Sequence, residues 1–170
     1  PSSGYKGSFS LKNIAKSWKE INLEGQFQGD SREIKVSSMK GRALDGTLGG
    51  SFHASWVRSL KVSGTIEARN LNPALITPDW PGIVNADFSS DITFSSSGYP
   101  EGKLKVNLLR SVVRKRPLTG NIDARWANGL FSLTHGELHG NGFDVSAQGV
   151  LQEKLDYQAK ITDLGGLIPQ

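Results

Sequence analysis

A strict two-residue alternation between residues 44 and 56 constrains the fold more than any other part of this 170-residue chain. The segment reads Leu-Asp-Gly-Thr-Leu-Gly-Gly-Ser-Phe-His-Ala-Ser-Trp, with an apolar residue or glycine at every even position. Because side chains alternate between the faces of a strand, the pattern predicts one long strand with an apolar and a polar face. Glycines on the apolar side indicate a sheet that bends sharply, or an apolar face that holds something other than side chains.

The same alternation recurs along most of the chain. Leu60–Ala68 and Leu118–Trp126 place apolar residues or glycine at every second position, and shorter stretches such as Leu104–Leu108 do the same. Strand signals of this kind, separated by turn residues, are typical of all-β proteins. We therefore expect an all-β fold, an elongated and mostly antiparallel sheet of about a dozen strands.

Three segments depart from this rhythm. Asn13–Glu20 (Asn-Ile-Ala-Lys-Ser-Trp-Lys-Glu) reads as a short helix that Asn13 caps. Asn70–Gly82 contains three prolines, which exclude a regular ladder and predict a short helix or an irregular cap. Arg110–Pro117 reads as a basic connection between strands.

Composition excludes several classes of protein. The chain has no cysteine, which excludes disulfides and thiolate zinc sites, and its net charge of +4 is too small to indicate a nucleic-acid partner. No apolar run approaches the ~20 residues that a membrane helix needs. The chain begins with Pro1 and shows no signal peptide, so we expect residues 1–170 to be a single segment excised from a larger protein.

The residues that carry catalytic chemistry are scattered. His135 and His139 are four residues apart, but in a strand-rich region that spacing does not bring them to one metal as it would on a helix. His53 falls on the polar face of its strand, and we expect all three histidines to be solvated or in turns. No pair of carboxylates, phosphate-binding loop or nucleophile elbow is evident. The sequence predicts no enzyme, no metal site and no cofactor.

Part of the chain repeats itself. Val62–Arg69 (Val-Ser-Gly-Thr-Ile-Glu-Ala-Arg) matches Leu118–Arg125 (Leu-Thr-Gly-Asn-Ile-Asp-Ala-Arg) position for position. Other echoes, such as that between Gly41–Phe52 and Gly140–Leu151, have unequal separations, so the repetition is irregular. A plain β meander that reuses the same turn residues also accounts for it.

The texture of these repeats resembles the AsmA/TamB group of bacterial envelope proteins, and the TamB branch most closely. The resemblance rests on the strand ending Ala-Arg-Asn-Leu at residues 68–71, on Pro81-Gly82, and on Gly-Asn-Gly-Phe-Asp-Val-Ser-Ala-Gln-Gly-Val-Leu at residues 140–151. It implies an extended open β-groove, or β-taco, in a protein that is anchored in the inner membrane of a Gram-negative bacterium and crosses the periplasm. It also implies an outer-membrane partner of the Omp85 class, and links to outer-membrane assembly and phospholipid transport.

The apolar face is the first candidate site. In an open sheet an acyl chain would fill its interior, and each buried methylene would contribute about 0.8 kcal/mol. A closed sandwich core is the alternative interpretation of the same residues. The residues expected to line a lipid groove are Leu44, Leu48, Phe52, Val62, Ile66, Leu118, Ile122, Phe143 and Val145.

The basic run Arg110, Arg114, Lys115 and Arg116 is the second candidate site, since these cations could meet anionic lipid headgroups at the lip of the groove. A solvated turn, or charge that protects a strand edge, is the alternative. The four tryptophans are either groove edges or core residues; they are Trp18, Trp56, Trp80 and Trp126.

These features favour a non-enzymatic segment that binds and conducts phospholipid acyl chains. One alternative is a chaperone-like surface that pairs with nascent outer-membrane strands by β-augmentation. Another is a structural repeat or adhesin module. If the sheet is open, its first and last strands should also pair edge to edge between copies of the segment.

Overall fold

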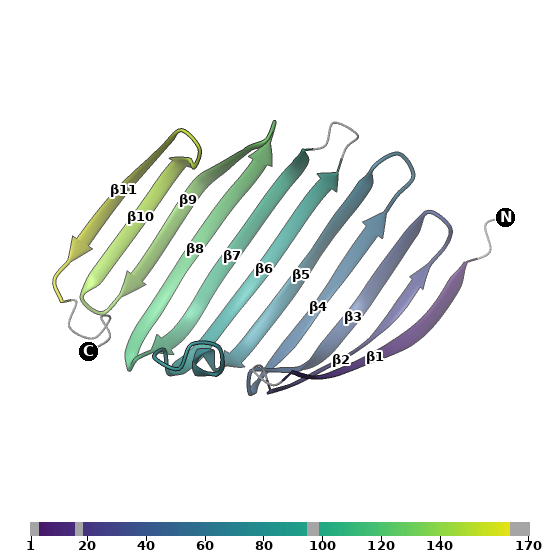
Figure 1. Cartoon of the computed structure of the whole chain (residues 1–170), viewed down its shortest axis with the longest axis horizontal. Helices are drawn as coiled ribbons and strands as arrows, with labels where there is room; N and C mark the ends of the chain where they lie inside the picture. The colour runs from purple at the N-terminus through teal and green to yellow at the C-terminus, as the bar shows by residue number, and fades with distance from the viewer. Residues whose placement is uncertain (1–3, 16–18, 95–98, 164–170) are drawn as a thin grey trace.

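The computed structural model describes residues 4–15, 19–94 and 99–163 of the chain (Figure 1). These residues form a single eleven-stranded sheet in which the strands follow one another in chain order and each is antiparallel to its neighbours. The predicted all-β, antiparallel fold class is confirmed. The strands are β1 (Tyr5–Ala15), β2 (Lys19–Gly29), β3 (Glu33–Ala43), β4 (Gly46–Ser55), β5 (Leu60–Leu71), β6 (Gly82–Phe94), β7 (Pro100–Val113), β8 (Arg116–Ala127), β9 (Leu130–Gly140), β10 (Phe143–Val150) and β11 (Lys154–Ile161).

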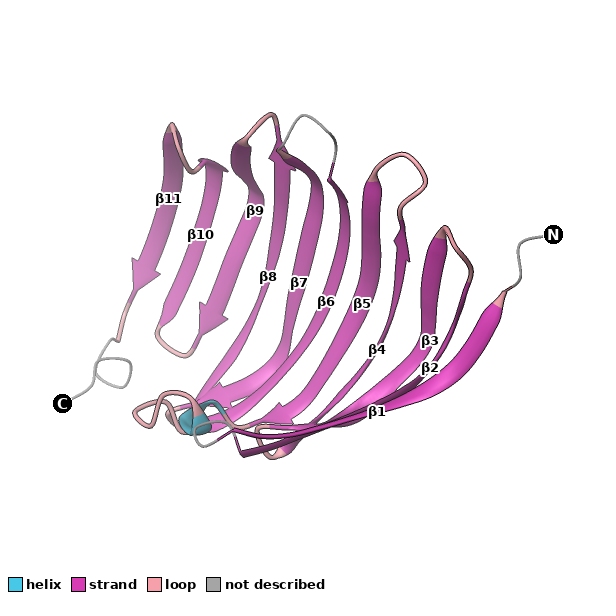
Figure 2. Cartoon of the chain, turned by 45° about the vertical axis from the view of Figure 1, so that its right-hand side comes forward, coloured by secondary structure: helices cyan, strands magenta, loops and turns pink. Residues whose placement is uncertain are grey.

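No second layer covers either face of this sheet in the described part of the chain, and the sheet twists and curves along its length (Figure 2). The even-numbered connections lie along one rim, which includes the β4–β5 turn. The odd-numbered connections lie along the other, the lower rim of Figure 1, and include the β7–β8 turn. The sheet therefore has two rims and two edges, and everything that the chain presents to a ligand lies on a face, a rim or an edge.

Two sequence predictions about strand ends are wrong. The strand expected over Leu44–Trp56 begins at Gly46, because Leu44 and Asp45 adopt positive φ values of 50° and 63° and form the β3–β4 turn. The basic connection expected over Arg110–Pro117 is strand on both sides of a two-residue turn, Arg114–Lys115, with φ values of 50° and 66°. Two-residue turns with positive φ suit hairpins because their twist matches that of the strands.

The two predicted helical segments had opposite outcomes. The helix expected over Asn13–Glu20 is wrong: the chain is extended up to Ala15 in β1 and from Lys19 in β2, and residues 16–18 lie outside the described residues. Pairing with the neighbouring strand overrides the weak local helix signal there. The cap expected over Asn70–Gly82 is confirmed, as a 3₁₀ helix at Pro73–Leu75 (η1) that Asn72 caps by accepting a hydrogen bond from the Ala74 amide.

The strand register collects the apolar residues on one face. One row of paired positions crosses all eleven strands without a polar side chain, and the next row does the same. The first row is Leu11, Leu23, Gly41, Leu48, Ala68, Ala86, Leu108, Gly120, Leu138, Val145 and Ala159. The second is Phe9, Gly25, Met39, Gly50, Ile66, Phe88, Val106, Ile122, Gly136, Ala147 and Tyr157.

The buried core is small for a sheet of this size. Its main cluster joins Val113, Leu118 and Phe143, which are 4%, 8% and 6% exposed, near the lower rim. Val84, Leu108 and Val145 pack against this cluster while remaining partly exposed. Most other apolar side chains contact only their neighbours on the same face, so the sheet buries far less apolar area than a two-layer domain would.

Extra residues bend the sheet between β5 and β8. Two strands each carry one residue more than the neighbours they pair with, β5 between Ala68 and Leu71 and β7 between Leu108 and Ser111. Bulges of this kind strengthen the local twist of a sheet. They also leave backbone groups without their ladder partners.

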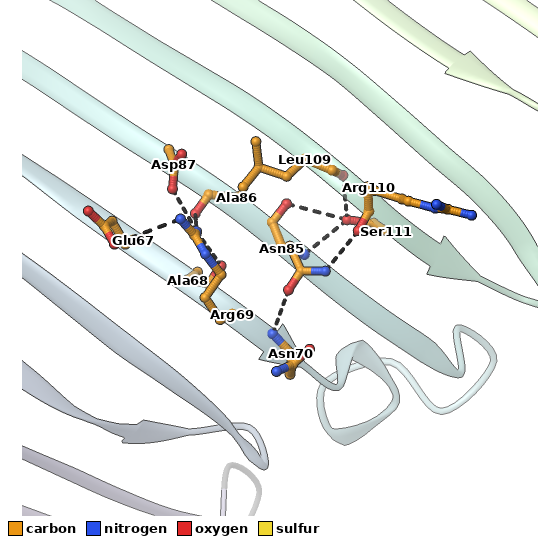
Figure 3. A network of polar contacts seen from close by, with 10 residues as sticks. All are labelled: Glu67, Ala68, Arg69, Asn70, Asn85, Ala86, Asp87, Leu109, Arg110 and Ser111. Carbon is orange, nitrogen blue, oxygen red and sulfur yellow. Dashed lines mark hydrogen bonds and ion pairs between the residues drawn. The ribbon is translucent and has the colours of Figure 1, made fainter.

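Asn85 and Ser111 satisfy those groups (Figure 3). The side-chain oxygen of Asn85 accepts from the Asn70 amide at 2.8 Å, and its side-chain nitrogen donates to the Arg110 carbonyl at 2.8 Å. The hydroxyl of Ser111, which is 1% exposed, accepts from the Asn85 amide and donates to the Leu109 carbonyl, both at 2.9 Å. Two small side chains thus replace the missing ladder bonds at the bulges.

Glycines on the apolar face allow adjacent strands to approach closely. A Cβ atom added to Gly50 would clash with the Thr65 carbonyl, whereas one added to Gly49, on the polar face, would meet only the Met39 carbonyl at 3.9 Å. Elsewhere an aromatic ring lies over the glycine of the neighbouring strand, as with Phe9 over Gly25. Such pairs restore contacts that glycine lacks.

We expect Gly50→Ala to destabilise the sheet by about 1–3 kcal/mol, because the backbone of β5 must move away from the new methyl group. Gly49→Ala is the matched control and should be neutral or slightly stabilising, since alanine restricts the unfolded chain. Urea unfolding followed by circular dichroism measures both variants. Equal effects of the two substitutions would contradict the close approach of β4 and β5 on the apolar face.

Candidate functional site: the uncovered apolar face

The centre of the candidate site is a contiguous apolar strip across β5 to β8. Ile66, Phe88, Val106 and Ile122 are paired in register, one on each strand. Three of these side chains remain well exposed: Ile66 and Ile122 at 42% and Phe88 at 37%. Side chains of this size are normally removed from water in a folded domain. Exposed apolar groups in a continuous strip therefore mark a binding surface.

The structure brings the predicted lining residues to this one face, with one exception. Leu48 and Phe52 of β4, Val62 and Ile66 of β5, Leu118 and Ile122 of β8, and Phe143 and Val145 of β10 share it. Leu44 lies in the β3–β4 turn at the lower rim. Leu118 and Phe143 are buried in the core cluster, so the exposed part of the face lies away from that end of β8 and β10.

The basic run divides into two parts. The guanidinium of Arg116 donates to the carbonyl of Asn141 at 2.8 Å and forms an ion pair with Asp163 at 2.6 Å, and its side chain is only 15% exposed. Arg110 and Lys115 are exposed, and no ion pair joins either of them to another described residue. Arg114 lies in the turn, with one guanidinium nitrogen buried and without a partner.

The aromatic residues concentrate at the rims. Trp56 is 43% exposed, and its indole nitrogen donates to the Ser31 carbonyl at 2.9 Å, which ties the β4–β5 turn to the β2–β3 turn. Trp126 packs edge-on against Phe131 with ring centroids 4.9 Å apart, and Trp80, 39% exposed, follows η1 at the lower rim. Trp18 lies outside the described residues.

The polar face contains open hollows lined by charged and polar groups. One hollow of about 500 Å³ is lined mainly by polar-face side chains of β2 to β5, among them Glu24, Lys40, Arg42, Glu67 and Arg69. Several of these groups already neutralise one another, for example Lys40 with Glu24 at 3.7 Å. Such hollows are filled with water and carry no catalytic arrangement, so we place the candidate site on the apolar face.

The histidines lie on the polar face, and the part of the chain that the structure describes contains no cluster able to hold a metal ion. His135 and His139 contact the two oxygens of Glu137 at 3.3 and 3.4 Å, and Nδ1 of His139 contacts Asp144 at 2.9 Å. His53 contacts Glu33 at 3.0 Å. The alternation places His135, Glu137 and His139 side by side on one strand, which sequence spacing alone did not reveal as an ion-pair cluster.

With the fold and the apolar face described, the comparison with known families is decisive. The chain matches the TamB N-terminal domain family over residues 2–170, essentially its whole length. The chain belongs to the TamB family. No curated protein and no solved structure matches it significantly. In this TamB-family segment, none of the helices within the described residues is long and apolar enough to cross a membrane.

We expect His139 to titrate above its ordinary value in this TamB-family sheet. The hydrogen bond to Asp144, and then that to Glu137, raise the pKa of His139, while the bond from His139 lowers the pKa of Glu137. A raised histidine pKa contributes stability below its unfolded pKa of about 6.5, and that contribution is lost as pH rises through the folded pKa.

Nuclear magnetic resonance titration of the histidine ring protons measures this. Asp144→Asn should move the pKa of His139 back toward its ordinary value, whereas Asp91→Asn, remote on the same face, should leave it unchanged. An unshifted His139 in the unmodified chain would show that the pair does not persist in solution.

Proposed function

We propose that the uncovered apolar face binds and conducts phospholipid acyl chains, as one segment of a periplasm-spanning protein that supports phospholipid transport and outer-membrane assembly. The single observation that carries this proposal is the exposed strip of Ile66, Phe88, Val106 and Ile122, which continues in register onto every other strand of the sheet. A ligand on this face must be apolar and long, because the strip is both. Acyl chains meet both conditions.

The geometry suits movement along the face as well as binding. The face is continuous from β1 to β11 and is not interrupted by a polar row. A chain that shifts by one strand, about 4.8 Å, exchanges one set of apolar contacts for a similar set. Total binding is then strong, at about 0.8 kcal/mol per buried methylene, while the difference between neighbouring positions is small.

Family membership supports the setting of this proposal. TamB-family proteins are associated with the bacterial envelope, and we propose a periplasmic location for this segment in a parent protein anchored in the inner membrane. The headgroup of a bound lipid would then lie at the lower rim, within reach of the basic run of Arg110, Arg114, Lys115 and Arg116. Catalysis plays no part in this function, and no cofactor is required.

Ile122→Asp should abolish lipid binding while the sheet still folds. The substitution places a carboxylate in the middle of the apolar strip, where desolvating an unpaired charge beneath an acyl chain is costly. Mass spectrometry of lipid extracted from purified protein should detect phospholipid with the unmodified chain and little with Ile122→Asp. Thr119→Asp, on the polar face of the same strand, is the control and should retain lipid.

In cells that carry the full-length protein, Ile122→Asp should reach the envelope and behave like a deletion in an outer-membrane integrity assay. Circular dichroism of the purified variant separates a failure to fold from a failure to bind. A folded Ile122→Asp protein that retains lipid and supports membrane integrity would overturn the proposal.

A specific observation also favours a second function, the pairing of nascent outer-membrane strands at an open edge, with an Omp85-class protein as the outer-membrane partner. All eight residues of β11 are exposed, and in the described chain this strand pairs only with β10. Its apolar-face residues, which include Leu155 and Tyr157, continue the alternation, with no proline or inward charge to block a further strand. Such an edge can be extended by β-augmentation.

The purified segment should therefore self-associate through its edges as its concentration rises. Tyr157→Lys places a charge on the apolar side of β11 and should weaken association, whereas Gln158→Lys, on the polar side, should not. Sedimentation velocity measures the association, and slower hydrogen exchange of β11 amides at high concentration locates it. A strictly monomeric protein would argue against an open edge and against this second function.

A further inference from the structure

The lower rim carries an apolar row on the outer, polar face of the sheet. Ile83 of β6 pairs with Val112 of β7, and Val112 pairs with Pro117 of β8. Because β6 and β8 keep a regular alternation from the apolar-face residues Ala86 and Gly120, these three side chains point to the opposite face. Ile83 and Val112 are 49% and 41% exposed, and Pro117 is exposed too. We call these three residues the outer apolar row.

This end of the sheet is consequently apolar on both faces. Val84 and Val113 lie on the inner face of the same strands and belong to the core cluster or pack against it. Farther along the outer face the corresponding row is polar, with Glu67, Asp87 and Asn107 in register. Strands that are apolar on both sides are normally covered on both sides. The outer apolar row has no such cover within the described residues.

The β5–β6 connection adds two more exposed apolar side chains at this rim. Ile76 and Trp80 are 53% and 39% exposed. The connection is held at the end of β7, since the Arg114 amide donates to the Pro81 carbonyl at 2.7 Å. An exposed tryptophan beside exposed aliphatic groups suits a boundary between water and an apolar phase.

The same rim carries net positive charge. Four cations, Arg110, Arg114, Lys115 and Arg116, face two carboxylates, those of Asp79 and Asp163, and the latter is already paired with Arg116. Arg114 and Lys115 occupy the turn with positive φ, a conformation that Asn128–Gly129 adopts in the β8–β9 turn at lower cost. The tip of this hairpin thus presents two cations where uncharged turn residues would suit the backbone better.

From these observations we infer that the lower rim at β6–β8 binds the surface of a bilayer that contains anionic phospholipid. The outer apolar row, Ile76 and Trp80 enter the interface, while Arg110 and Lys115 contact the headgroups. The net positive charge favours an anionic surface and disfavours a second copy of the same rim. This inference concerns the outer face and the rim, so it adds to the proposed function without depending on acyl chains on the apolar face.

Flotation with vesicles tests the inference. The unmodified chain should bind vesicles of phosphatidylethanolamine and phosphatidylglycerol, and bind vesicles of phosphatidylcholine alone much less. The double variant Arg110→Gln with Lys115→Gln should lower the partition coefficient on the order of tenfold, since each cation near an anionic surface contributes favourably. Lys61→Gln with Lys103→Gln removes the same charge from exposed positions near the other rim and should have little effect.

A second substitution separates the apolar contribution and protects against misfolding. Val112→Ser on the outer face should weaken binding while leaving the circular dichroism spectrum unchanged, and Ile122→Asp should leave vesicle binding intact even if it abolishes acyl-chain binding. Three outcomes would overturn the inference: equal losses in the two charge variants, equal binding to neutral vesicles, or dependence on Ile122 rather than Val112. Capture of an acidic protein with no affinity for vesicles would likewise overturn it and assign the rim to a protein partner.

Discussion

The rest of the structure depends on one constraint: the apolar side chains of a single-layer sheet have only their cross-strand neighbours to pack against. In a sandwich, Ile66, Phe88 and Ile122 would meet side chains from a second sheet. Here they remain 37–42% exposed. An isolated sheet face of this kind loses the contacts that normally offset the entropy of ordering the chain. Occupation by an apolar ligand would therefore stabilise the fold as well as serve its function.

The alternation along the chain was sufficient to predict the strands and the face on which most lining residues lie. Leu48, Phe52 and Ile122 fall where a two-residue period places them, because the register carries that period from strand to strand. The prediction failed at Leu44, since Leu-Asp lacks the turn signature that Asn-Gly would have provided. It also failed over Asn13–Glu20, where a short helical pattern and a strand have similar local propensities and pairing with β2 decides the outcome.

Other features depend on pairing between strands and could not be predicted from local sequence. The bulges in β5 and β7 are visible only in the register, and so are the roles of Asn85 and Ser111, which satisfy the backbone there. The outer apolar row is a further example. Ile83 and Val112 look like ordinary members of their strands until the register shows that they face the polar side together.

The repeat has a physical consequence for how such a sheet can be extended. Val62–Arg69 lies in β5 and its counterpart Leu118–Arg125 lies in β8, so the two segments run in opposite directions. Both still deliver their apolar residues to the same face, because the apolar period of two has no direction. Each strand in such a sheet contacts only its two neighbours, so strands can be added without redesigning a shared core. A binding face built in this way grows in proportion to the number of strands, and its length is limited only by the length of the chain that supplies them.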